Sequence, residues 1–85
     1  MKLDQDTTYD GWRNRATWNV ALWLGNNYVV YNAARGYKNY PQPYLSLRDD
    51  FRKGPMLKCT NTGDGVSLWD PSLDIDALNE TIKEF

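Results

Sequence analysis

A tyrosine-rich segment carries the residue types that best suit binding. Tyr37, Lys38, Tyr40 and Tyr44 surround two prolines in residues 37–44. Proline lacks a backbone N–H and restricts the residue before it, so we expect a loop that displays its rings. Such a loop suits contact with a protein or stacking on a nucleic-acid base. The sequence equally supports the opposite interpretation, in which Tyr40 and Tyr44 pack onto helices.

The middle of the chain has an excess of positive charge, although the net charge of the whole chain is only -1. Residues 11–60 hold eight basic and two acidic side chains, and residues 61–85 hold one basic and six acidic. A nucleic-acid strand would be contacted by arginines and lysines of this middle segment, and the candidates are Arg13, Arg15, Arg35 and Lys38. We favour the simpler explanation, that the acidic C-terminal part folds against the basic middle.

Catalytic and metal-binding patterns are weak. The chain has no histidine and one cysteine, Cys59, which excludes Ser-His-Asp and Cys-His systems and the usual zinc ligand sets. Asp70, Asp74 and Asp76 could gather Mg²⁺, but Asp74 and Asp76 fit the start of a helix better. Residues 61–65, Asn-Thr-Gly-Asp-Gly, predict a turn rather than a phosphate or calcium loop. We therefore expect no enzyme, no cofactor and no metal site.

The element most able to organise this chain is a tryptophan-rich helix. Residues 12–24 contain three of the four tryptophans. Asn14 is a good N-cap for a helix over residues 15–24, which Gly25 would end. Apolar residues cover nearly all of this helix, leaving Arg15 and Asn19 as a narrow polar stripe, so we expect it to be buried. Its predicted core residues are Trp18, Leu22 and Trp23.

The remaining elements complete a small, mainly α fold. Helices are expected over residues 28–37, 44–53 and 74–85, with Asp74 as the N-cap of the last. Short strands are expected at residues 56–60 and 66–69. The predicted fold has three to four helices around the tryptophan-rich helix, with or without one short β-hairpin. Residues 1–10 are expected to be a flexible lead-in, and residues 11–85 a single globular domain.

The stretch from Asn14 to Asn27 resembles the leading motif of a family of small uncharacterised phage and bacterial proteins. The motif reads Asn-x-x-Thr-Trp-x-x-x-Leu-Trp, followed by an Asn pair, and residues 64–66 and 70–79 are also similar. The resemblance covers less than half of the chain and leaves out residues 37–60. It implies a phage or accessory origin and brings no activity.

The composition indicates where the protein is located and which classes of partner it binds. No apolar run approaches the roughly 18 residues that span a bilayer, and the first residues lack the apolar stretch of a signal peptide. We expect a cytoplasmic protein, in the host cytoplasm if phage-encoded, that does not bind membranes. The leading hypothesis is a non-enzymatic interaction module, a phage accessory protein that binds a host protein. The alternative is a nucleic-acid-binding protein. The sequence specifies neither the partner nor the oligomeric state.

Overall fold

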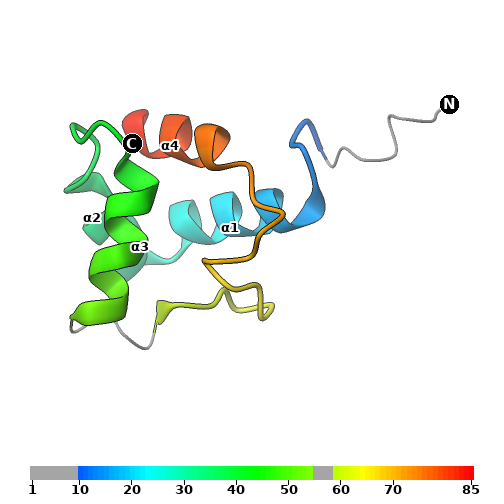
Figure 1. Cartoon of the computed structure of the whole chain (residues 1–85), viewed down its shortest axis with the longest axis horizontal. Coiled ribbons are helices and arrows are strands. Elements are labelled where there is room, and N and C mark those ends of the chain that lie inside the picture. The colour runs from blue at the N-terminus through cyan, green and yellow to red at the C-terminus, as the bar shows by residue number, and fades with distance from the viewer. Residues whose placement is uncertain (1–9, 55–58) are drawn as a thin grey trace, which may run out of the picture.

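Four helices form the ordered framework of the chain. The computed structural model describes residues 10–54 and 59–85, which contain α1 (Arg15–Asn26), α2 (Tyr28–Arg35), α3 (Pro43–Lys53) and α4 (Ile75–Lys83). α1 packs against α2 and α4, and α3 packs against α4 and α2 (Figure 1). The mainly α prediction is confirmed. The expected lead-in over residues 1–10 lies outside the described residues, apart from Asp10.

Asparagine and aspartate caps set where the helices begin. Asn14 accepts hydrogen bonds from the Thr17 backbone N–H at 2.8 Å and from the Thr17 hydroxyl at 2.7 Å, as a helix N-cap does. Asn27 ends α1, because its N–H donates to Trp23 O at 3.0 Å, and begins α2, because its side chain accepts from Val30 N at 3.1 Å. The prediction that Gly25 ends the first helix is therefore wrong by two residues.

The face of α1 that enters the core differs from the predicted one. The prediction that Leu22 is a core residue is wrong, because this side chain is 45% exposed. Trp18 and Trp23 are half-buried, and Trp23 packs against the core. The buried residues of α1 include Thr17, Val20, Ala21 and Leu24, spaced at i, i+3, i+4 and i+7. The first residue of this buried stripe, Thr17, is polar. A prediction that considered only apolar residues therefore placed the buried face of the helix on a different side.

The core combines residues from all four helices and from the segment that joins α3 to α4. The aliphatic residues of α1 and α2 meet two aromatic residues of α3, Tyr44 and Phe51, and the apolar side of α4. The fully or nearly fully buried apolar side chains are Val20, Ala21, Leu24, Val30, Ala34, Tyr44, Leu47, Phe51, Leu68, Leu73, Leu78 and Ile82.

Residues 61–67 form a tight turn that is fastened to α1. Thr62 N donates to Val66 O and Gly65 N donates to Thr62 O, both at 2.9 Å, and Gly65 has a φ of +88°, which favours glycine. Asn61 and Ser67 form one isolated antiparallel bridge. The turn prediction is confirmed. The strand expected at 66–69 is reduced to that bridge, and most of the one expected at 56–60 lies outside the described residues.

Asn19 is the residue that holds this turn in place. It lies on the narrow polar stripe predicted for this helix, and only 4% of its surface is exposed. The Thr62 hydroxyl donates to Asn19 Oδ1 at 2.6 Å, and Asn19 Nδ2 donates to Asp64 Oδ2 at 2.7 Å. Because both polar ends of its side chain are bonded, burial costs Asn19 little.

Two further side-chain networks connect the last helix to the others. At the start of α4, Asp74 N donates to the Thr17 hydroxyl at 3.0 Å, and Asn14 Nδ2 donates to Ser72 O at 2.7 Å. Near the start of α3, Asn79 accepts from Tyr44 N at 2.8 Å. These bonds join the N-terminal ends of α1 and α3 to α4.

The helices are short. The longest, α1, has 12 residues. Across residues 10–54 and 59–85, none of the helices combines the length and apolar composition that crossing a bilayer requires.

Candidate functional site

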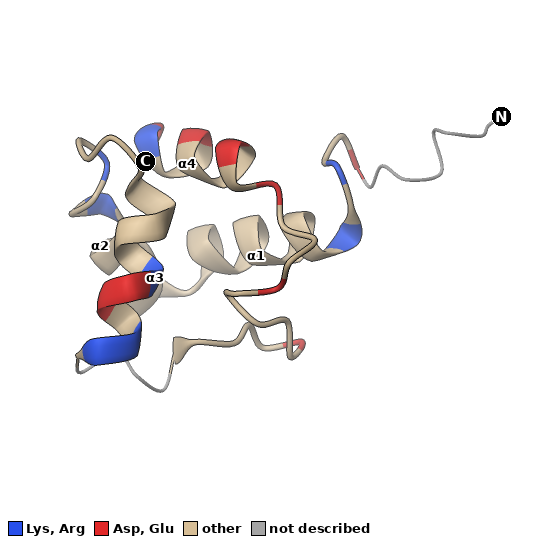
Figure 2. Cartoon of the chain, viewed as in Figure 1, with Lys and Arg blue, Asp and Glu red and all other residues tan. Residues whose placement is uncertain are grey.

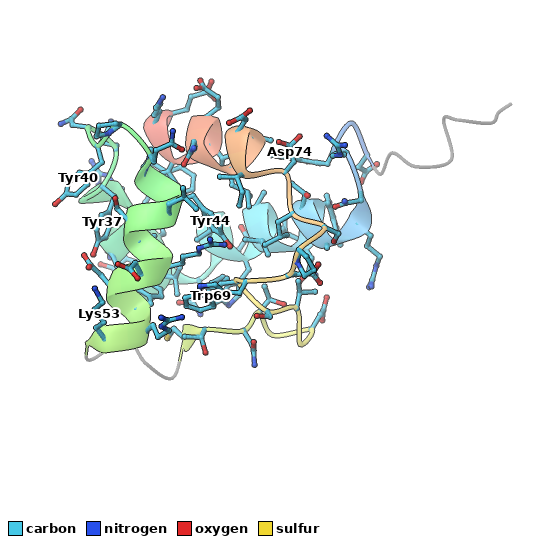
Figure 3. The ribbon with its side chains drawn as sticks, in the orientation of Figure 1. Tyr37, Tyr40, Tyr44, Lys53, Trp69 and Asp74 are labelled. Atoms are coloured by element: carbon cyan, nitrogen blue, oxygen red, sulfur yellow. The ribbon has the colours of Figure 1, made fainter. Side chains whose placement is uncertain are left out.

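The tyrosine-rich loop is only partly an exposed surface. The prediction that Tyr44 belongs to an interaction surface is wrong, because Tyr44 is fully buried at the start of α3. Its hydroxyl donates to Leu68 O at 2.7 Å, and burial raises the pKa of the phenol above its ordinary value. Tyr44 thus belongs to the core (Figure 3), where its hydroxyl fastens the segment before α4.

Tyr37 and Tyr40 form a pair at the other end of this loop. Their ring centroids lie 5.2 Å apart in an edge-to-face arrangement. The Tyr37 hydroxyl donates to Asp50 Oδ2 at 2.7 Å, and partial burial, followed by this bond, raises the pKa of Tyr37 to about 12. Tyr37 and Lys38 are half-buried, whereas Tyr40 is 47% exposed. Of the predicted loop surface, Tyr40 is therefore the exposed residue.

Among the described residues, the most exposed large apolar side chains lie on α2, which sequence reasoning did not single out. Tyr28 is 78% exposed and Val29 57%. Asn32 and Arg35, also exposed, fall on the same side of the helix by the 3.6-residue repeat, while Val30 and Ala34 point into the core. We call Tyr28, Val29, Asn32 and Arg35 the α2 surface. The sequence could have indicated this exposure, since the helical repeat places Tyr28 and Val29 on a different side of α2 from the buried Val30 and Ala34.

Arg35 sits at the C-terminal end of the α2 surface. Its guanidinium carbon lies 5.8 Å from the centre of the Tyr31 ring, within cation–π range. The Tyr31 ring in turn lies 4.9 Å from the ring of Phe85, next to the end of α4. These two contacts restrict the position of the Arg35 side chain at this end of the α2 surface.

The four basic residues proposed for nucleic-acid contact are not brought together. Arg13 and Arg15 precede and begin α1, whereas Arg35 ends α2 and Lys38 follows it. Figure 2 shows the basic residues near the start of α1 at one end of the molecule and those of α2 and α3 at the other. The 12 residues of α1 alone span about 18 Å. These residues do not form one continuous patch.

The three aspartates considered for a metal site have separate structural roles. Asp70 accepts hydrogen bonds from the Ser72 hydroxyl and the Ser72 N–H, which lower the pKa of Asp70. Asp74 caps α4 by accepting from Ala77 N at 3.2 Å, and Asp76 lies in the first turn of that helix. A groove of about 490 Å³ runs past Asp74 and Asp76 to Arg13. In the described part of the chain, no cluster of three metal-ligating side chains occurs.

A basic and aromatic cluster lies on α3 and was not predicted as a site. Arg48 and Arg52, one helical turn apart, each place their guanidinium carbon 5.6 Å from the Trp69 ring centre. Trp69 comes from the segment before α4 and lies beside α3 in Figure 3. Both arginines belong to the basic middle segment, but their shared aromatic partner is far along the chain, so no local pattern pairs them. An open groove of about 470 Å³ adjoins this cluster.

Comparison with known proteins places the chain in a family without assigning it an activity. No match was found among curated proteins, and none among solved structures. The family match extends over residues 5–85, and thus covers the tryptophan-rich motif, all four helices and the segment 37–60. This chain belongs to the DUF7249 family, a family of unknown function.

Proposed function

We propose that this chain is a non-enzymatic protein-binding module that uses the α2 surface. The observation that supports the proposal is the exposure of two adjacent large residues, Tyr28 at 78% and Val29 at 57%, on a helix whose opposite side, Val30 and Ala34, is packed into the core. Placing such residues in water forgoes the free energy that burying them would release, about 1.5–3 kcal/mol for a side chain of this size. A partner that covers them would recover it.

The charge of the α2 surface indicates the chemistry of the partner. Residues 11–48 contain no aspartate or glutamate, and Arg35 forms no ion pair within the described residues. The complementary protein surface would therefore combine an apolar hollow for Tyr28 and Val29 with a carboxylate for Arg35. Tyrosine and arginine are also the residue types that most often dominate interface energies.

The resemblance of the tryptophan-rich motif to phage and bacterial proteins supports a finer proposal. In it, the chain is a phage accessory protein that acts in the host cytoplasm, and the partner is a host protein. The rigid backbone of α2 suits such binding, since a surface on a packed helix loses little conformational freedom when a partner docks.

The experiment has two steps, and the first uses site-specific crosslinking. A photoreactive phenylalanine analogue replaces Tyr28 in one variant and the exposed Asp76 of α4 in a control variant. Both are irradiated in cells of the encoding organism or its host. The expected result is a crosslinked protein that forms from position 28 and not from position 76. If positions 28 and 76 give the same crosslinked products, the α2 surface is not the binding site.

The second step measures affinity with the purified partner. Changing Tyr28 and Val29 together to serine should weaken binding by at least about 10-fold, because an interface aromatic residue commonly contributes more than 1 kcal/mol. The matched control is Leu22→Ser, which also removes an exposed apolar side chain, but from α1. Equal affinities of the double variant and the wild-type chain would contradict the proposal.

Nucleic-acid binding remains the alternative proposal, and it has less support from the geometry. Arg13 and Arg15 lie at the start of α1, whereas Arg35 ends α2 and Lys38 follows it, and Figure 2 shows the basic residues of these two regions at opposite ends of the molecule. Phosphate contacts would make the affinity fall steeply with salt concentration. A salt titration with single-stranded DNA therefore separates the two proposals.

A further inference from the structure

Arg48 and Arg52 are held in place by aromatic rings. Both guanidinium carbons lie 5.6 Å from the Trp69 ring, and that of Arg48 also lies 5.9 Å from the Tyr44 ring. Arg48 Nη1 donates a long hydrogen bond of 3.4 Å to Leu68 O. These distances are within cation–π range, and such contacts restrict the arginine rotamers before any ligand arrives while leaving N–H donors of each guanidinium available.

These guanidinium groups have donors to spare. Each carries five N–H donors, yet within residues 10–54 and 59–85 neither arginine forms an ion pair with a carboxylate. The acidic residues next to Arg48 or next to Trp69 in sequence bond elsewhere. Asp49 pairs with Lys53 at 3.1 Å, Asp50 accepts from the Tyr37 hydroxyl, and Asp70 accepts from Ser72.

The surroundings of the pair form a concave surface. The groove of about 470 Å³ beside the pair is lined by Leu45, Ser46, Arg48, Asp49, Arg52 and Trp69. This volume falls in the range of small-molecule sites. Arg48 is half-buried, which strengthens its interaction with an opposite charge relative to a fully solvated side chain.

We propose that the Arg48–Trp69–Arg52 cluster binds the phosphate group of a small phosphorylated ligand. The two guanidinium groups place two positive charges within cation–π range of one ring, and a phosphate monoester carries close to two negative charges at neutral pH. A single carboxylate would neutralise only half of this charge. Arginine also bonds phosphate oxygens in pairs, through parallel N–H donors. This site lies on α3 and does not depend on the α2 surface.

The test follows the arginine side chains by NMR while inorganic phosphate or adenosine monophosphate is added to the whole chain. The Nε–Hε signals of Arg48 and Arg52 are expected to shift and then saturate with either probe. Sodium chloride at the same ionic strength should not reproduce this saturation. Tighter binding of adenosine monophosphate would identify a nucleotide as the source of the phosphate, and equal affinity would identify the phosphate group alone.

Variants decide whether the two arginines form the site. Arg52→Gln removes an exposed side chain and should leave the backbone spectrum folded while weakening phosphate binding by about 10-fold or more. Arg48→Gln should also weaken phosphate binding by about 10-fold or more. The backbone spectrum shows whether this variant is folded. Lys53→Gln, which removes the neighbouring charge on α3, should change affinity by less than about twofold. The proposal is overturned if binding does not saturate, or if Lys53→Gln weakens it as much as Arg52→Gln.

Discussion

Replacing Asn19 by alanine should strongly destabilise the fold, although the residue is a neutral polar side chain on the narrow polar stripe of α1. Its amide accepts from the Thr62 hydroxyl at 2.6 Å and donates to the Asp64 carboxylate at 2.7 Å. These two bonds connect α1 to a turn more than 40 residues further along the chain. Alanine would remove both and leave the buried Thr62 hydroxyl without its acceptor.

The size of the effect follows from the two bonds. A neutral hydrogen bond contributes about 1 kcal/mol and one to a charged group about 1.5–3 kcal/mol. Because Asp64 is exposed to solvent, the lower part of this range applies, and the expected loss in the free energy of unfolding is about 2–3 kcal/mol. With a urea m-value of about 1 kcal/mol/M for a chain of this size, the unfolding midpoint should fall by about 2–3 M.

The assay is urea unfolding followed by circular dichroism and tryptophan fluorescence. Asn26→Ala is the matched control, since it makes the same change at an exposed position of the same helix and should alter stability by less than about 0.5 kcal/mol. Combining Asn19→Ala with Thr62→Val should cost about 1 kcal/mol less than the two single changes added together, because each removes the same bond. An Asn19→Ala variant as stable as Asn26→Ala would refute the reasoning.

Three further predictions concern the core and the tyrosines. Leu24→Ala should cost about 2–5 kcal/mol, whereas Leu22→Ala should cost less than about 1 kcal/mol, because only Leu24 is fully buried; urea unfolding measures both. Tyr44→Phe should cost about 1–2 kcal/mol in the same measurement, because Leu68 O loses its short hydrogen bond. Since the pKa of Tyr37 is raised to about 12, the folded chain keeps this phenol protonated while the unfolded chain ionises near pH 10. The stabilisation is therefore complete below pH 10 and is lost as the pH rises to about 12. Tyr37→Phe should make the loss of stability between pH 10 and 12 less steep, and an unchanged slope would contradict this assignment.

Local signals were sufficient to predict most of the helices. Asn14, Asn27 and Asp74 each cap a helix through a bond to a backbone N–H three residues later, and such a bond depends only on nearby sequence. The proline-bearing loop before α3 was predictable for the same reason. These features require no knowledge of what the helices pack against.

Features that depend on distant contacts were not predictable in this way. Tyr44 can be buried because its polar groups are bonded: Leu68 O accepts from its hydroxyl, and Asn79 accepts from its N–H. Neither partner is close to Tyr44 in sequence. A tyrosine that directly follows a proline-bearing loop is equally consistent with a displayed ring. The Arg48–Trp69–Arg52 cluster was not predictable for the same reason, because only the tertiary fold brings Trp69 next to the two arginines.

The tryptophan-rich motif of this chain combines residues with different structural roles, and these roles indicate where a binding surface should be sought. Asn14 and Thr17 are explained by the fold, because they cap α1 and bond the start of α4. Leu22, in the same motif, is 45% exposed and lines a small groove beside the Thr62–Asp64 turn, so core packing does not explain it. The Leu22→Ser variant therefore does more than serve as a control for the α2 surface. If it weakens partner binding while the Tyr28 and Val29 changes do not, the partner docks on α1 at the end of the motif.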